Sequence, residues 1–173
     1  GSKQIGRLTD EQGYLARVPV VIRGNAVHIP RRMATIFTLG YQKRSITEFV
    51  DLLRESSIDV LVDVRETAWS HKPGFSKGAL TENLAAAGIG YVHAKFAGNP
   101  KRLRRNATSH AACLRAYERY VEENDEIVDS FEVLVGPLVK EGKRVCLVCF
   151  ERHHEDCHRS ILAERWRERG RRR

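Results

Sequence analysis

From residue 35 onward, short apolar runs of strand length alternate with segments of helical periodicity, and this alternation is what most constrains the fold. The runs that have the length and apolar content of buried parallel strands are 35–39, 59–64, 89–93 and 144–150. Helical patterns begin at a capping box formed by Ser45 and Glu48, and continue at 77–87, 110–122, 125–140 and 156–169. The order predicts a Rossmann-like α/β fold, with an open, mostly parallel sheet flanked by helices.

The first 34 residues follow a different pattern. Gly1-Ser2 resembles the remnant of a cleaved tag. Apolar runs at 18–22 and 26–29, on either side of a turn, predict a short β-hairpin. We therefore expect an N-terminal β extension (1–34), one α/β domain (35–169) and a basic tail (170–173). Within the domain, Gly136-Pro137 is expected to kink or break the helix at 125–140.

The chain is basic, and its cations are unevenly placed. Lysine and arginine total 30 against 22 acidic residues, which gives a net charge of +8. One cluster consists of Lys101, Arg102, Arg104 and Arg105, and a second runs from 165 to 173. Such clusters attract polyanions, so we expect contact with nucleic acid, DNA rather than RNA, or with a nucleotide. A solvated helix end is the alternative for the terminal run.

No apolar run reaches the length of a membrane span. We therefore expect a soluble, cytoplasmic protein without a membrane partner, and free thiols at its four cysteines.

Polar residues follow the predicted strands, where an open parallel sheet binds its ligands. In chain order they are Tyr41 and Lys43, then Asp63 and Arg65, then Glu151, and finally Cys157, His158 and Arg159 at a helix start. Asp63 and Glu151 supply the pair of carboxylates that general acid or base catalysis uses. Each of the two is also a candidate for a purely structural role, Asp63 in an ion pair and Glu151 in a solvent-facing loop.

The segment Cys157-His158-Arg159 lies where free N–H groups and the helix dipole stabilise an anion, which favours phosphate binding. The same field favours a thiolate at Cys157, so this residue is a candidate nucleophile. In the alternative reading, Cys157 packs under the helix and Arg159 pairs with a carboxylate.

The loop at 71–77 combines lysines with an aromatic ring. Lys72 is suited to phosphate contact, and Phe75 or the nearby Trp69 is suited to stacking on a nucleobase. Packing of Phe75 in the core is the alternative. Neither a P-loop nor a dinucleotide-binding motif is present.

A zinc site must also be weighed, because Cys146-x-x-Cys149 precedes several further potential ligands, namely His153, His154, Cys157 and His158. Residues three apart on a strand point to opposite faces, so Cys146 and Cys149 are expected in the core. We therefore expect no metal and no cofactor.

Several motifs together resemble one family. They are Thr38-Leu39-Gly40-Tyr41 with Ser45 and Glu48, the run 59–65, Lys72-Pro73-Gly74-Phe75, and Cys149-Phe150-Glu151 through Cys157-His158-Arg159-Ser160. Over about residues 35–168 the chain is similar to the family named domain of unknown function 488 (DUF488). The resemblance implies a compact Rossmann-like domain with these motifs in its cleft, and it assigns no function.

The leading hypothesis is a hydrolase that cleaves a base–sugar N-glycosidic bond, as a DNA glycosylase does in base repair or modified-base removal. Asp63 or Glu151 would act on the bond, while cations would hold phosphate and Tyr41 or Phe75 would contact the base. The predicted phosphate contacts are Lys43, Arg65, Lys72, His158 and Arg159. Three alternatives remain open: a binding module without catalysis, a cysteine-dependent transferase or phosphatase using Cys157, and a metal-dependent nuclease using Asp63, Glu66 and Glu151.

Overall fold

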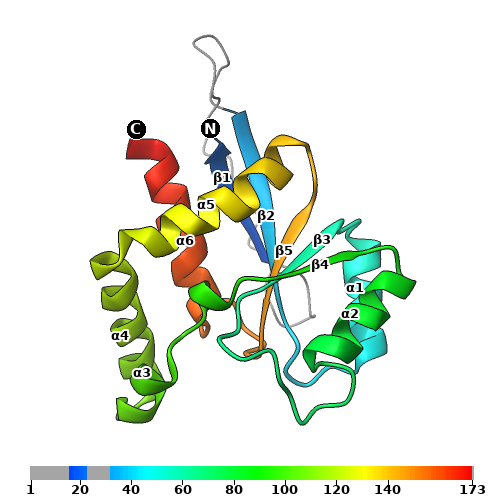
Figure 1. Cartoon of the computed structure of the whole chain (residues 1–173), viewed down its shortest axis with the longest axis horizontal. Helices are drawn as coiled ribbons and strands as arrows, with labels where there is room; N and C mark the ends of the chain where they lie inside the picture. The colour runs from blue at the N-terminus through cyan, green and yellow to red at the C-terminus, as the bar shows by residue number, and fades with distance from the viewer. Residues whose placement is uncertain (1–15, 23–31, 173) are drawn as a thin grey trace, which may run out of the picture.

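The computed structural model describes residues 16–22 and 32–172, which form an α/β domain built on one five-stranded sheet (Figure 1). The strands are β1 (Ala16–Ile22), β2 (Arg32–Gly40), β3 (Val60–Asp63), β4 (Gly90–His93) and β5 (Val145–Cys149), in the spatial order β1-β2-β5-β3-β4. The pairs β2–β5, β5–β3 and β3–β4 are parallel, and β1 joins β2 antiparallel at the edge. The predicted open, mostly parallel α/β fold is confirmed.

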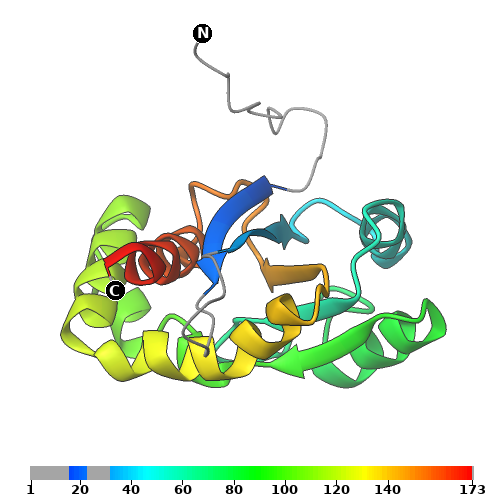
Figure 2. The same cartoon turned by 90° about the horizontal axis from the view of Figure 1, so that it is seen from above.

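Helices cover both faces of the sheet. They are α1 (Ile46–Glu55), α2 (Lys77–Ala86), α3 (Lys101–Asn106), α4 (His110–Glu123), α5 (Asp125–Lys140) and α6 (His158–Arg172), with a short 3-10 turn, η2, at Lys95–Ala97. Buried residues of α1 and α2 pack on one face, and those of α4, α5 and α6 pack on the other. The view from above shows α5 along one side of the sheet and α1 on the opposite side (Figure 2).

The N-terminal strand belongs to the same sheet as the rest of the domain. β1 pairs with β2 from Ala16, opposite Thr38, to Ile22, opposite Arg32. The second arm of the hairpin is therefore β2 itself, which is longer than the predicted run at 35–39; the run at 26–29 lies outside the described residues. The extension predicted for 1–34 thus contributes an edge strand to the domain, and an edge is where Pro19 is tolerated.

Two helices differ from the sequence-based expectation. α5 does not break at Gly136-Pro137 but continues through Pro137. Pro137 removes one N–H, whose partner would be the carbonyl oxygen of Val133, and Val133 lies on the exposed side of the helix, at 76% exposure. The basic cluster that begins at Lys101 lies between the strand predicted at 89–93 and the helix predicted at 110–122, where no helix was predicted, yet it forms α3. No helix in the described part of the chain is both long and apolar enough to cross a membrane.

Gly40 ends β2 where another segment of backbone approaches it. A Cβ atom built on Gly40 would lie 1.7 Å from the carbonyl oxygen of Glu151. The next two residues also bind this segment, because Tyr41 N donates to Cys149 O at 3.2 Å and Gln42 N donates to Phe150 O at 2.9 Å. Glycine at position 40 is therefore needed for the segment after β5 to lie against β2.

We predict that Gly40→Ala destabilises the protein by about 1–3 kcal/mol, because the added methyl group overlaps backbone that cannot move without breaking these bonds. The matched control is Gly78→Ala on α2, where a Cβ meets nothing within 4 Å. This change should stabilise the helix by up to about 1 kcal/mol. Urea unfolding measures both, and equal stabilities for the two variants would contradict the close approach at Gly40.

Candidate functional site

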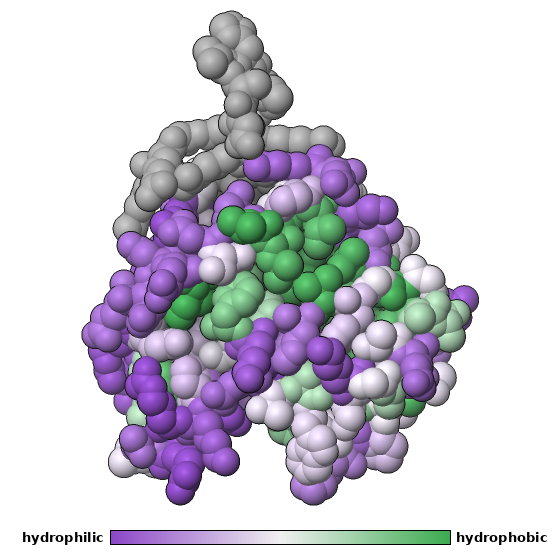
Figure 3. Space-filling model, viewed as in Figure 1, coloured by the Kyte–Doolittle hydropathy of each residue, from purple (hydrophilic) through white to green (hydrophobic). Residues whose placement is uncertain are grey.

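The carboxyl ends of the parallel strands open into a cleft of about 270 Å³. Its walls come from the segments that follow β2, β3 and β5, together with α3 and the start of α6; the lining residues are Tyr41, Arg65, Glu66, Thr67, Trp69, Asn99, Arg104, Cys149, Phe150, Glu151 and His158. The space-filling view shows a notch between α3–α4 and the loop after β3 (Figure 3). Larger hollows of about 470 and 440 Å³ lie along α6, but neither is lined by a cysteine.

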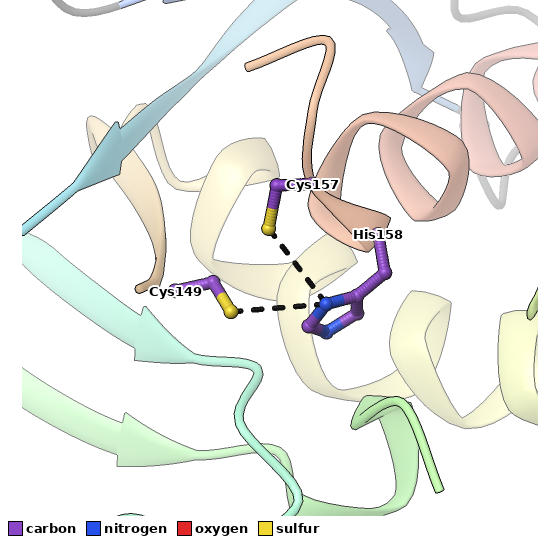
Figure 4. Close-up of side chains that lie close together, drawn as sticks. All are labelled: Cys149, Cys157 and His158. Carbon is purple, nitrogen blue, oxygen red and sulfur yellow. Dashed lines mark hydrogen bonds between the residues drawn. The ribbon is translucent and has the colours of Figure 1, made fainter. Parts of the chain in front are cut away.

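Two cysteines and a histidine meet at the floor of this cleft (Figure 4). Cys149 is the last residue of β5, Cys157 directly precedes α6, and His158 is the first residue of α6. Each sulfur lies 3.7 Å from His158 Nδ1, and the three donor atoms lie within 4.8 Å of one another. Cys149 and His158 line the cleft, whereas Cys157 lies behind them and is 1% exposed.

The orientation of the His158 ring is fixed from its other side. Nε2 lies 2.8 Å from the carbonyl oxygen of Val64. A carbonyl oxygen can only accept, so Nε2 carries the proton of this bond, and Nδ1 is left facing the two sulfurs. The edge of the Tyr117 ring packs against the imidazole at a centroid distance of 4.9 Å.

The two thiols differ in acidity. Burial opposes ionisation of Cys157, but the hydrogen bond with Cys149 and the charge of His158 outweigh it and hold the pKa of Cys157 well below its usual range. The same hydrogen bond, together with burial, raises the pKa of Cys149. The pKa values of the two thiols are therefore shifted in opposite directions, that of Cys157 downward and that of Cys149 upward.

Glu151 is the cleft carboxylate that lies next to the cysteines. Its Oε2 lies 3.4 Å from Cys149 Sγ, and burial together with the nearby Cys157 charge raises its pKa. Its backbone is held by Arg159, which donates to the carbonyl oxygens of Glu151 at 2.7 Å and Arg152 at 3.2 Å. Arg159 is 1% exposed, so it positions this loop, and the phosphate contact predicted for it has no exposed surface to support it.

Asp63 and Arg65 form a buried ion pair next to the cleft. Arg65 Nε donates to Asp63 Oδ1 at 2.8 Å and Nη2 to Oδ2 at 2.6 Å, while Tyr91 Oη also donates to Oδ2, at 2.7 Å. Burial works to lower the pKa of Arg65, but its bonds to Asp63 outweigh burial and raise it. Both Asp63 oxygens are occupied and the residue is 0% exposed, so the structure favours the ion-pair reading over the acid or base role.

Aromatic residues divide into buried and exposed groups around the cleft. Phe75 is fully buried and stacks on Tyr41 with centroids 4.4 Å apart, so the predicted base contact by Phe75 has no exposed ring face. Trp69 and Phe150, in contrast, are 58% and 44% exposed, and both line the cleft. Of the two lysines predicted to bind phosphate, Lys43 is exposed and Lys72 is half-buried, and neither lines the cleft.

The two basic clusters differ in their pairing. All four cations of the first cluster lie exposed on α3; Arg104 lines the cleft and bonds to Glu66 at 2.7 Å, and Arg102 lies over the Tyr120 ring. In α6, Arg165, Arg167 and Arg169 pair with acidic residues of α4, α5 and α6, which are Glu118, Glu122, Asp125, Asp129, Glu164 and Glu168. The positive charges of Arg165, Arg167 and Arg169 are thus largely neutralised by neighbouring acidic side chains.

Sequence reasoning found most of the cleft but missed its sulfur cluster. As expected, Cys146 and Cys149 face opposite sides of the sheet, because Cys146 belongs to the core under α1 and α2 and Cys149 to the core under α4 to α6. Cys149 is nevertheless brought to Cys157 and His158, and these three make the metal-capable group found among the described residues. The signal available in the sequence was a cysteine at a strand end together with Cys-His at a following helix start.

The sequence profile of the family described as "Domain of unknown function DUF488" matches residues 45–166. The chain belongs to this family. No curated protein matches it. Two crystal structures from Shewanella putrefaciens CN-32, at 1.60 and 1.40 Å resolution and described as "Putative phosphatase (DUF442)", are similar to this DUF488 chain at 13% identity. The matches cover 90% and 95% of this chain and 73% and 78% of the other, with TM-scores of 0.39 and 0.40.

We predict that Asp63→Asn destabilises this DUF488 protein by about 3–5 kcal/mol, because it leaves the buried Arg65 guanidinium without its counter-charge. The matched control is Glu66→Gln, which removes the exposed ion pair with Arg104 and should cost no more than about 1 kcal/mol. Urea unfolding followed by circular dichroism measures both changes. A fully stable Asp63→Asn protein would show that the pair is not structural and would return Asp63 to the catalytic candidates.

Proposed function

We propose that this protein is a cysteine-dependent enzyme, a hydrolase or transferase, whose reaction on a phosphate-bearing substrate takes place in the cleft at Cys149. The observation that carries the proposal is the convergence of Cys149, Cys157 and His158 at the floor of this cleft. Metal-binding histidines are held in place by a partner on their second nitrogen, and the Val64 carbonyl supplies such a partner to His158.

A structural role alone does not account for this arrangement. A free cysteine in a core behaves as a small apolar side chain, and it needs neither a histidine nor a carboxylate beside it. Here His158 is aimed at both sulfurs, and Glu151 lies against Cys149 from the cleft side. Buried polar groups gathered at one open hollow are typical of a reactive centre.

The walls of the cleft favour an anionic substrate with an aromatic part. Trp69 and Phe150 offer exposed rings for stacking, and Arg104 stands at the wall with the other cations of α3 beside it. A nucleotide, free or within a nucleic acid, combines both properties. We therefore propose nucleotides and nucleic acids as the substrate class.

N-glycosidic cleavage is a second candidate. Glu151 lines the cleft and, unlike Asp63, is not bound by an arginine through both carboxylate oxygens. A single carboxylate of this kind can assist loss of a base from its sugar. Abasic sites formed by the wild type and not by Glu151→Gln would favour this reaction over cysteine-dependent chemistry.

We expect Cys149→Ser and Cys157→Ser each to lower kcat by at least about 100-fold on the substrate that the wild type turns over. The assay is a panel of phosphate monoesters, nucleotides and single- and double-stranded oligonucleotides, with product analysis by mass spectrometry. Cys113→Ser is the matched control, because Cys113 is half-buried on α4 and lies outside the cluster. Activity that survives in both cluster variants would refute the proposal.

We expect Trp69→Ala to raise KM by about 5- to 100-fold with a smaller change in kcat, since stacking on a base contributes about 1–3 kcal/mol. Phe96→Ala is the control, because Phe96 is 40% exposed but is not part of the cleft wall. Steady-state kinetics on the same substrate measures both variants. An unchanged KM in Trp69→Ala would mean that Trp69 does not contact the substrate.

A further inference from the structure

We propose that Cys149, Cys157 and His158 bind one thiophilic divalent metal ion, Zn²⁺, at the floor of the cleft. As an account of how the cysteines act, this inference rests on the proposed function, whereas binding itself can be measured without a substrate. Two sulfurs and one imidazole nitrogen form a donor set that zinc sites use.

The separations between the donor atoms suit a single ion. Zinc holds sulfur at about 2.3 Å and nitrogen at about 2.0–2.1 Å in tetrahedral geometry, which places a sulfur and a nitrogen ligand about 3.6 Å apart. The distances from His158 Nδ1 to Cys149 Sγ and to Cys157 Sγ are both 3.7 Å. The three side chains therefore need little movement to share one ion.

The atoms around the cluster also have the arrangement expected for a metal ligand. The bond from His158 Nε2 to the Val64 carbonyl oxygen leaves the Nδ1 lone pair for the ion, and metal-binding histidines commonly make such a bond with their second nitrogen. His158 is also held by the Tyr117 ring, and both cysteines are buried in the same core cluster. The ligands are thus fixed before any ion arrives.

Three protein ligands leave one tetrahedral position for another group. Catalytic zinc sites keep such a position, whereas structural sites fill it with a fourth side chain. Glu151 lies on the cleft side of Cys149 Sγ, at 3.4 Å, where a carboxylate can accept a proton from water. An ion with an open position can activate water near neutral pH, which suits the hydrolase form of the proposed function.

Zn²⁺ binding releases protons from the ligands and changes no oxidation state. The ion takes two thiolate sulfurs and one neutral imidazole nitrogen as ligands. Any protons on Cys149, Cys157 and His158 Nδ1 pass to solvent, while the Nε2 proton stays on the Val64 bond. No oxidant or reductant takes part.

The test uses the full chain, purified under reducing conditions, stripped with chelator and reloaded with Zn²⁺ or Co²⁺. We expect one ion per chain after desalting, and a thiolate-to-cobalt absorption band with Co²⁺. Cys149→Ser, Cys157→Ser and His158→Gln should each weaken Zn²⁺ binding by at least about 100-fold, since even loss of an outer partner costs about 10- to 100-fold. Glu151→Gln should weaken Zn²⁺ binding less than any of these three substitutions does.

Two controls test the assignment of the ligands. Cys113→Ser should bind as the wild type does, because Cys113 lies outside the cluster. Cys146→Ala should also bind normally, because Cys146 faces the other side of the sheet, and a loss here would instead indicate a Cys146-x-x-Cys149 site. If the cluster variants do not fold, alkylation of the wild-type thiols tests the metal site instead. Bound Zn²⁺ should protect Cys149 and Cys157 from alkylation but should not protect Cys113.

The outcomes separate this inference from the proposed function. A wild type that binds far less than one ion per chain, unaltered affinity in the cysteine variants, or absence of thiol protection would overturn the metal site. Activity that needs both cysteines but is indifferent to chelator would overturn it and leave the proposed function standing. If the wild type binds one ion per chain but activity survives the loss of either cysteine, the metal site is supported and the proposed function is refuted.

Discussion

A buried guanidinium–carboxylate pair holds the carboxyl-end edge of the sheet together. Arg65 reaches Asp63 through two bonds, and its remaining Nη1 group donates to Tyr41 Oη and to the carbonyl oxygen of Phe75. Tyr91 of β4 binds the same carboxylate. One ion pair therefore links β3, β4, the segment after β2 and the loop before α2, which explains why so polar a pair is tolerated at 0% and 6% exposure.

The sulfur cluster depends on that frame without being part of it. Cys149 is placed by the central strand β5, and Cys157 and His158 are placed by the start of α6. The bond from His158 to Val64 ties this helix start to the segment between Asp63 and Arg65. On the other side, Arg159 and the close approach at Gly40 hold the backbone of Glu151. The two cysteines and His158 thus lie where the end of β5, the start of α6 and the segment after β3 meet.

Charge on this molecule is less uniform than its net value of +8 suggests. The arginines of α6 serve the packing of helices, since they pair with acids on α4 and α5. The cations of α3 lie exposed beside the cleft, and Arg104 forms part of its wall. Paired surface charges contribute little net field, and Arg104 is itself paired with Glu66, so the proposed attraction of an anionic substrate to the α3 side would come mainly from Lys101, Arg102 and Arg105.

The sequence by itself determined the α/β architecture, the strand-end location of the cleft and most of its residues, because hydrophobic periodicity and capping are local properties of the chain. It also determined that Cys146 and Cys149 face opposite sides of the sheet. Only the tertiary structure decided that Asp63 is saturated by Arg65 and Tyr91, and that Cys149 joins Cys157 and His158. Those partners lie on different elements, so their meeting depends on strand order and helix placement, which local patterns do not encode.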